Sequence, residues 1–172
     1  MFVIFINDLD QILSSDVTSK LFADDAKLYT VIETKENIDN LQENIDKLCA
    51  WANDWQLNIA IEKCNIIDFS TTDKDIRFEN AINGKSLPRV NEVKDLGVLF
   101  DSRLRFSGHI AQMVTKAKQR LFLLFRAFRI REKKPLLRAY KSYILPLLNH
   151  CSSVWSPSLL GDIKKIESVQ RL

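Results

Sequence analysis

Two adjacent carboxylates, Asp24 and Asp25, are the residues of this chain whose type and position best suit chemistry. They stand between two short segments, 20–23 and 26–32, that are rich in apolar, aromatic and β-branched residues. This pattern predicts a β-hairpin with both acids at its turn. Two carboxylates on a rigid hairpin suit a hard divalent cation, because Mg²⁺ prefers oxygen ligands, and such an ion held near a phosphate activates a nucleophile. The alternative interpretation is a solvated turn with two surface acids.

A helix predicted over residues 33–55 would support this hairpin. Thr34 can cap its start, and Glu36 lies in the first turn, where the helix dipole favours an acid. We expect Trp51 and the apolar stripe to pack in the core beneath the sheet. The stripe recurs at spacings of three and four residues: Ile38, Leu41, Ile45, Leu48, Ala52 and Trp55.

Further strands are predicted after this helix. Residues 65–70 form an apolar stretch typical of a strand. Residues 76–90 predict a β-hairpin, because Asn83-Gly84 is the preferred pair for a turn whose two central residues need positive φ. Residues 93–101 predict one strand followed by a turn. Gly97 inside it indicates a bulge or a close approach between the backbone and another group.

Charge is distributed unevenly behind the formal net charge of +3. Residues 1–102 hold 10 Lys/Arg and 19 Asp/Glu, a balance of −9, whereas residues 103–141 hold 12 Lys/Arg and one acid, a balance of +11. Residues 142–172 are close to neutral, at +1. An acidic front joined to a basic middle indicates a polyanionic partner, and a solvated helix surface is the alternative.

The basic middle is predicted to be helical. Residues 109–131 show an apolar face with Lys and Arg around the rest of the helix. Pro135 fits the first turn of a second helix, and Pro146 kinks or ends that helix. Residues 163–172 show a weaker helical pattern. A basic pair of helices suits a phosphate backbone, and no arrangement here reads bases, so we expect little sequence specificity.

Length and composition fit one ordinary domain or two small lobes, at 172 residues with few Gly and Pro. No segment resembles a targeting signal or a membrane span, and we expect no membrane partner. Cys49, Cys64 and Cys151 have no paired spacing, which favours free thiols in a reducing compartment and an intracellular location, cytoplasmic or nuclear. His150 and Cys151 are adjacent rather than spaced as zinc ligands usually are.

The stretch from Leu21 to Tyr29 resembles the aspartate-pair motif of reverse transcriptases, in the form used by non-LTR (LINE-type) retrotransposons. The resemblance continues in the family's order. Residues 5–9 resemble the end of the palm helix, residues 57–63 the next palm motif, residues 93–110 the primer-grip region and its exit, and residues 145–157 the end of the thumb. It therefore covers nearly the whole chain.

The resemblance implies a function for particular residues. Asp24 and Asp25 would hold Mg²⁺ or Mn²⁺, Lys63 would donate a proton to the leaving pyrophosphate, and the partners would be an RNA template, a DNA primer and deoxynucleotides. Leu96, Gly97 and Val98 would belong to the primer grip. The residues expected to contact nucleic acid are Lys116, Lys118, Arg120, Arg126, Arg129, Arg131, Lys133 and Lys134.

The architecture expected is α+β: an incomplete palm over residues 1–106, with antiparallel strands and one packed helix, then a mostly helical thumb over residues 107–172. The family's third carboxylate and its fingers would precede Met1, so we expect the chain alone to be inactive as a polymerase. Two alternatives stay open at this point: a nucleic-acid-binding module without catalysis, and an unrelated α+β interaction protein whose basic face binds an acidic partner.

Overall fold

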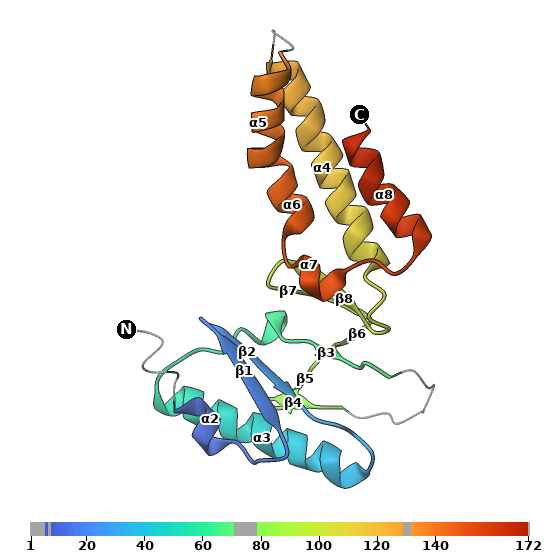
Figure 1. Cartoon of the computed structure of the whole chain (residues 1–172). Helices are drawn as coiled ribbons and strands as arrows, with labels where there is room; N and C mark the ends of the chain where they lie inside the picture. Colours follow the sequence, from blue (N-terminus) through green and yellow to red (C-terminus); the bar gives the residue numbers. More distant parts are fainter. Residues whose placement is uncertain (1–5, 7, 71–78, 129–131, 172) are drawn as a thin grey trace. The chain divides into compact units, whose positions relative to one another are not determined.

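Helices and short antiparallel strands make up the computed structural model, which describes residues 6, 8–70, 79–128 and 132–171 (Figure 1). This mixture confirms the α+β class expected from the sequence. The chain divides into two units, Met1–Ile66 with Lys74–Arg89 and Ile67–Asp73 with Val90–Leu172. Each unit has a hydrophobic cluster of its own.

The first unit contains the predicted hairpin. Strands β1 (Thr18–Phe22) and β2 (Asp25–Tyr29) pair antiparallel, with Phe22 opposite Asp25. The turn between them is therefore only two residues long, Ala23 and Asp24, so the expectation that both acids lie at the turn is wrong for Asp25, the first residue of β2. A short helix, α2 (Leu9–Ile12), precedes the hairpin, and the first five residues of the chain lie outside the described residues.

Helix α3 (Lys35–Asp54) confirms the helix predicted over residues 33–55. At its start, the side-chain oxygen of Asn37 accepts a hydrogen bond from the Thr34 N–H at 3.0 Å, which satisfies the backbone as in a capping box. The expectation that Trp55 lies in the core is wrong, because Trp55 is 45% exposed. α3 has already ended at this residue, so the helix no longer carries its side chain along the apolar stripe. Trp51 is half-buried, with its ring 6.4 Å from that of Trp55.

The inward face of α3 carries both apolar residues and one buried polar residue. Ile45, Cys49 and Ile82 form the buried cluster, and Leu28 of β2 packs against it. Asn44 lies on the same helix and is fully buried. These contacts attach the hairpin to α3 through β2.

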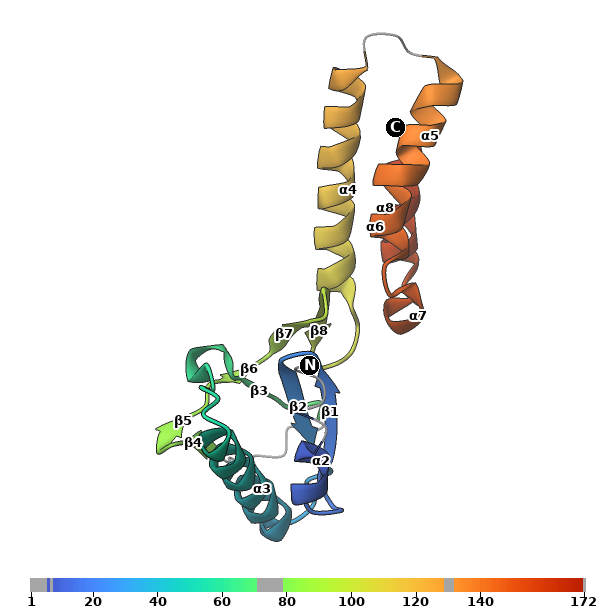
Figure 2. The ribbon, with the colours of Figure 1, turned by 90° about the vertical axis from the view of Figure 1, so that its left-hand side faces the viewer.

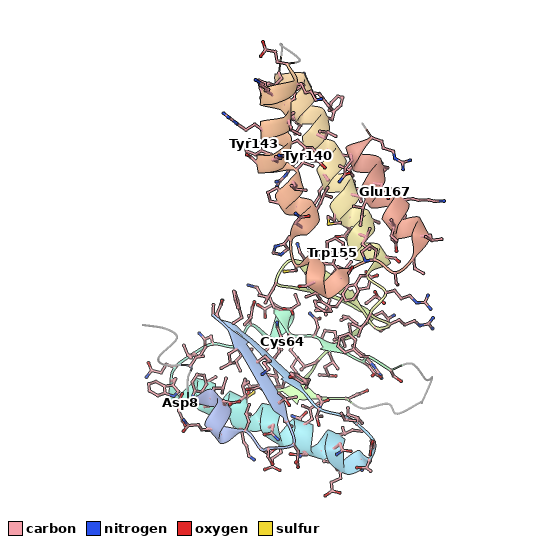
Figure 3. The ribbon with its side chains drawn as sticks, viewed as in Figure 1. Asp8, Cys64, Tyr140, Tyr143, Trp155 and Glu167 are labelled. Atoms are coloured by element: carbon pink, nitrogen blue, oxygen red, sulfur yellow. The ribbon has the colours of Figure 1, made fainter. Side chains whose placement is uncertain are left out.

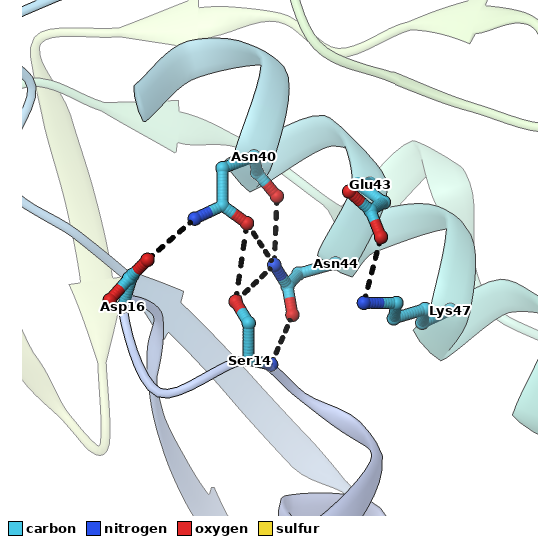
Figure 4. Close-up of polar contacts among 6 residues, drawn as sticks. All are labelled: Ser14, Asp16, Asn40, Glu43, Asn44 and Lys47. Carbon is cyan, nitrogen blue, oxygen red and sulfur yellow. Dashed lines mark hydrogen bonds and ion pairs between the residues drawn. The ribbon is translucent and has the colours of Figure 1, made fainter. Parts of the chain in front are cut away.

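Asn44 connects α3 to the segment that leads into β1 (Figure 4). Its Oδ1 accepts a hydrogen bond from the Ser14 N–H at 2.7 Å, and its Nδ2 donates to the Ser14 Oγ at 2.8 Å. The same Nδ2 donates to the backbone oxygen of Asn40 at 2.8 Å. Asn40 in turn donates to the carboxylate of Asp16 at 3.3 Å. A buried amide with this many partners fixes where β1 begins.

The remaining strands of the first unit are short. β4 (Ala81–Ile82) and β5 (Lys85–Ser86) pair around Asn83 and Gly84, whose φ angles of +50° and +75° confirm the predicted turn. Residues 76–78 of that prediction lie outside the described residues. On α3, the Gln42 amide holds β4 as a neighbouring strand would, accepting from the Ala81 N–H and donating to the Ala81 carbonyl, both at 2.9 Å.

The strand predicted over residues 65–70 is shorter than expected. Only β3 (Ile66–Ile67) forms there, and it pairs with β6 (Arg89–Val90). The Ile66 N–H donates to the carbonyl of Pro88 at 3.0 Å. Pro88 has no N–H with which to return a bond, which limits the length of the ladder.

In the second unit, the single strand predicted over residues 93–101 is wrong. The segment forms a hairpin instead, β7 (Glu92–Asp95) and β8 (Val98–Asp101), with Asp95 opposite Val98. The turn consists of Leu96 and Gly97, whose φ angles are +45° and +90°. Positive φ at both central residues is the geometry of a tight two-residue hairpin turn. Leu at the first of these positions is what concealed the turn in the sequence.

The helices of the second unit pack around α4 (Ser107–Ala127), as Figures 1 and 2 show. α5 (Lys133–Tyr143) and α6 (Leu145–Asn149) run back along α4, and α8 (Leu160–Gln170) also packs along it. The short helix α7 (Ser152–Trp155) connects α6 to α8. The helix break between α5 and α6 confirms the effect expected of Pro146, which lies in the first turn of α6. Residues 129–131 lie outside the described part of the chain.

The cluster of this unit centres on α4, whose Ile110 and Ala117 are fully buried. A buried carboxylate fixes one end of it. Asp162 of α8 accepts a hydrogen bond from the Ser107 hydroxyl at 2.6 Å and pairs with Lys165 at 2.8 Å. Both partners lower the pKa of Asp162, and the lysine has the larger effect.

Candidate metal-binding hairpin and nucleic-acid interface

The tip of the β1–β2 hairpin presents the carboxylates of Asp24 and Asp25 to solvent. Asp24 lies within the two-residue turn, and Asp25 is the first residue of β2. Ala23, which precedes them, has a φ of +53°, in the left-handed region that residues other than glycine seldom adopt. Such strained positions cluster at functional sites. The turn therefore places two adjacent oxygen-bearing groups at the tip of a hairpin, in a backbone conformation that costs energy.

The two faces of this hairpin differ. One face is held inside the unit, because Ser19 is buried with its hydroxyl hydrogen-bonded to Asp10, and Leu28 packs on the cluster of α3. The other face stays open, with Phe22 60% exposed and directly opposite Asp25. The register places three cross-strand pairs on this open face: Phe22 with Asp25, Lys20 with Lys27, and Thr18 with Tyr29.

The donor set at the turn fits a cation that keeps most of its water. Mg²⁺ is usually bound through one or two carboxylates, several waters and the phosphates of a substrate. Asp24 and Asp25 supply two such carboxylates. Among the residues that the structure describes, no group of three or more His, Cys, Asp or Glu side chains is placed to enclose a metal ion. The hairpin thus has the chemistry of a partial, open site.

Lys63 lies in the same unit, in a short 3₁₀ turn, Ile61–Lys63. Its N–H donates to the Ala60 carbonyl at 2.9 Å, and its own carbonyl accepts from the Asn65 side chain at 3.1 Å. The backbone of Lys63 is held by these two bonds, and its side chain is exposed. Within the described residues, no hydrogen bond or ion pair joins Lys63 to Asp24 or Asp25.

The three residues predicted for the grip lie at the tip of the β7–β8 hairpin. Leu96 is 43% exposed, Gly97 forms the second half of the turn, and Val98 is 2% exposed. Val98 packs against the same cluster as Ile110 of α4. The side chain of Val98 therefore anchors the hairpin, and the backbone of Leu96 and Gly97 forms the exposed tip.

A carboxylate that the sequence did not single out fixes the exit from this hairpin. Asp101 accepts hydrogen bonds from the N–H groups of Phe106 at 2.8 Å, Arg105 at 3.0 Å and Arg103 at 3.0 Å. Burial acts to raise the pKa of Asp101, but these bonds outweigh it and lower the pKa below its usual value. An Asp followed by polar residues after a strand is a signal of such a turn. It is too common to identify this one.

Two histidines also contact the hairpin. His109 of α4 accepts a hydrogen bond from the Leu99 N–H through its Nδ1 at 3.2 Å, and His150 lies 3.2 Å from the Leu96 carbonyl through its Nε2. Burial lowers the pKa of His109, and positive charge on His150 and on Lys116 adds to the effect. The sequence predicted that Gly97 would be approached closely. It gave no sign that His150, more than fifty residues away, would be the group that approaches.

The predicted basic residues spread around α4 rather than along one line. Lys116 and Arg120 are one turn apart on one flank, whereas Lys118 is two residues from Lys116 and so lies on the opposite flank. Lys133 and Lys134 begin α5. Arg129 and Arg131 lie outside the described residues. The exposed cations of the set are Lys116, Lys118, Arg120, Arg126, Lys133 and Lys134.

The described residues thus contain an aspartate-tipped hairpin packed on a helix, and a second hairpin packed on a basic helical unit. Comparison with known proteins finds similar sequences among the polymerases of mobile elements. The chain is 27% identical, over 95% of its length, to the RNA-directed DNA polymerase from the mobile element jockey of Drosophila funebris. It is 27% identical over 77% of its length to the probable RNA-directed DNA polymerase from transposon X-element of Drosophila melanogaster.

The jockey polymerase of Drosophila melanogaster is 26% identical over 90% of the chain. The chain is therefore similar to part of the RNA-directed DNA polymerases from these non-LTR mobile elements. It spans only 15–18% of the length of these three proteins. No protein-family model matches the chain. No solved structure matches it either.

The thiols of Cys49, Cys64 and Cys151 are free. No helix in the described ranges is long and apolar enough to cross a membrane.

Proposed function

We propose that this chain supplies part of the palm, the primer grip and the thumb of an RNA-directed DNA polymerase of the non-LTR type. The observation that carries the proposal is the exposed Asp24–Asp25 pair at a strained two-residue turn, in a hairpin held by α3 through Leu28. The relationship to the jockey and X-element polymerases gives that pair its chemical context.

In this proposal the reaction is the transfer of a nucleotide to the 3′ end of a primer. Asp24, assisted by Asp25, holds a divalent cation. Bound Mg²⁺ or Mn²⁺ would make the primer hydroxyl a better nucleophile and offset the charge of the incoming triphosphate. Lys63 gives a proton to the leaving pyrophosphate, where a positive group stabilises developing charge. Because Ala23 and the cross-strand pair of Phe22 with Asp25 set the turn, the carboxylates are oriented before substrate binds.

The second unit holds the substrate. The exposed cations of α4 and α5 neutralise phosphates of an RNA–DNA duplex, and the tip of the β7–β8 hairpin supports the primer end. Each phosphate neutralised makes the negative slope of log affinity against log salt steeper by about 0.9. Because these side chains contact the backbone and no base edges, binding should depend little on sequence.

Binding of the chain to a labelled RNA–DNA duplex across a salt series, with and without Mg²⁺, tests this proposal. We expect steep salt dependence in wild type. In Lys116→Ala the slope of log affinity against log salt should be shallower by about one unit. Gln112→Ala, at an exposed uncharged position on the same helix, should leave the slope unchanged and serves as the control. Absence of binding at low salt would contradict the proposed role of the helices.

The chain alone is not expected to extend a primer. The proposal assigns no residue of this chain to the third metal-binding carboxylate or to the nucleotide-selecting fingers that the family resemblance implies. Metal-dependent extension by the purified chain would refute this part of the proposal.

A second candidate function is binding of nucleic acid without catalysis, which the exposed cations of α4 and α5 favour. In that case Asp24→Asn would leave nucleic-acid binding, and the effect of Mg²⁺ on it, unchanged. Relationship to polymerases argues against the third interpretation, an unrelated protein whose basic face binds an acidic partner.

A further inference from the structure

The tip of the β7–β8 hairpin has backbone groups that its own strands cannot satisfy. In a hairpin with a two-residue turn, the closing pair exchanges hydrogen bonds and the next pair does not. Asp95 and Val98 are the closing pair, so the N–H of Leu99, in the next pair, points away from β7. The carbonyl of Leu96 lies within the turn itself. These two groups flank the tip and are open to partners from elsewhere in the unit or from water.

His150 supplies the partner for the turn. Its Nε2 lies 3.2 Å from the Leu96 carbonyl oxygen. Because a carbonyl only accepts, the Nε2 must carry the proton and donate it, which leaves the nearby Cys151 sulfur, at 3.5 Å, as no more than a weak acceptor. The same Nε2 occupies the space beside Gly97. A Cβ at residue 97 would lie 3.0 Å from it.

His109 supplies the partner for the strand. Its Nδ1 accepts a hydrogen bond from the Leu99 N–H at 3.2 Å, which requires an unprotonated Nδ1. Both histidines are connected through Trp155, which is 3% exposed and labelled in Figure 3. The Trp155 Nε1 donates to the His150 carbonyl at 2.7 Å, and its ring lies 5.5 Å from that of His109.

We propose that His150 and His109 are positioning residues that hold the tip of the β7–β8 hairpin, so that a rigid Leu96–Gly97 backbone meets the terminal nucleotide of a bound primer. The inference rests on the proposed function for its second half, the contact with a primer end. Its first half, the fixing of the tip by two imidazoles, is a property of the free chain. The requirement for glycine at residue 97 follows from it, since the His150 ring takes the place of a side chain.

Amide hydrogen exchange in the full chain tests the first half. His150→Ala should raise the exchange rates of the turn amides by about three- to tenfold, the effect of losing one hydrogen bond. His150→Gln keeps a donor at a similar reach and should restore most of the protection. His109→Asn should retain the acceptor for Leu99, and His109→Leu should lose it. Equal exchange in His150→Ala and wild type, with both folded by circular dichroism, would overturn the proposal.

An RNA–DNA duplex with 2-aminopurine at the primer 3′ terminus tests the second half. We expect His150→Ala to bind the duplex with unchanged affinity but to lose the fluorescence change at the primer end, and His150→Gln to recover it. If wild type shows no duplex binding, the proposed function fails. The exchange data still decide whether His150 and His109 hold the tip of the hairpin. If duplex binds and the fluorescence is the same in all variants, the tip does not meet the primer end and the second half is wrong.

Discussion

The two units of this chain each contain a hairpin with a two-residue turn, and the two hairpins are supported at different places. At Ala23–Asp24 the tip carries exposed acidic side chains, and the supporting contacts are made by the strands below it. At Leu96–Gly97 the tip itself is held, through His150 and His109. Metal binding needs unengaged oxygens, whereas a support for another molecule needs a fixed backbone. The difference therefore matches the two roles proposed.

The largest expected effect is on catalysis. In a chimera in which this chain replaces the matched part of a jockey RNA-directed DNA polymerase, Asp24→Asn should reduce primer extension by about a thousandfold, because a lost metal ligand removes several kcal/mol of transition-state stabilisation. Steady-state extension with saturating duplex measures it. Asp54→Asn, an exposed acid at the end of α3, is the control. Retention of full activity in Asp24→Asn would show that the aspartate hairpin is a solvated turn.

A smaller effect, on the free energy of unfolding, is expected for Asn44, which supports the β1–β2 hairpin. Asn44→Ala removes the acceptor of the Ser14 N–H and the donor to the Ser14 hydroxyl, and it should lower the free energy of unfolding by about 3 kcal/mol. Urea denaturation measures this loss. Asn53→Ala, at an exposed position of the same helix, should be neutral or slightly stabilising. Equal effects of the two substitutions would mean that the buried network does not fix the hairpin.

Gly97→Ala should lower the free energy of unfolding by about 1–2 kcal/mol, because the φ of +90° at residue 97 and the His150 ring both oppose a Cβ. A double-mutant cycle with His150→Ala separates the two causes. If the ring contributes, Gly97→Ala should cost less in the His150→Ala background, and the remainder is the backbone strain. Strict additivity of the two substitutions would show that His150 does not pack on the turn.

The smallest effect concerns pH. Because the pKa of His109 is lowered in the folded chain, the unfolded chain binds the extra proton first as pH falls below its ordinary value of 6.5. The stability contributed by neutral His109 is therefore complete above pH 6.5 and is lost as pH falls below it. Denaturation midpoints between pH 8 and pH 5 should decline in wild type and decline less in His109→Asn. An identical pH dependence in the two proteins would contradict the assignment.

Local patterns in the sequence predicted the parts of the fold that depend on neighbouring residues. The Asp24–Asp25 hairpin, the start of α3 at Thr34 and the Asn83-Gly84 turn were each encoded by residue types and short spacing. The candidate metal ligands fell within the same local pattern, which is why they could be chosen before the structure was known.

Contacts between distant residues could not be predicted in this way. The turn at Leu96 was concealed because leucine rarely adopts positive φ, and its supporting partner, His150, lies 54 residues later. Asn44 was not singled out from the sequence, because its bond to Ser14 joins residues 30 positions apart. The prediction that Trp55 is buried failed because its burial depends on where α3 ends. Helix ends are set by tertiary contacts as much as by sequence.

The most direct test of the central claim is a titration of the isotopically labelled chain with Mn²⁺, observed by paramagnetic broadening of backbone amide resonances. This experiment needs no other part of a polymerase. The account predicts that broadening begins at the amides around Asp24 and Asp25, and that it disappears in Asp24→Asn while the acidic surface of α3, at Glu43 and Asp46, serves as the internal reference. Broadening no stronger at the hairpin than at α3, and unaltered by Asp24→Asn, would contradict the assignment of a metal site.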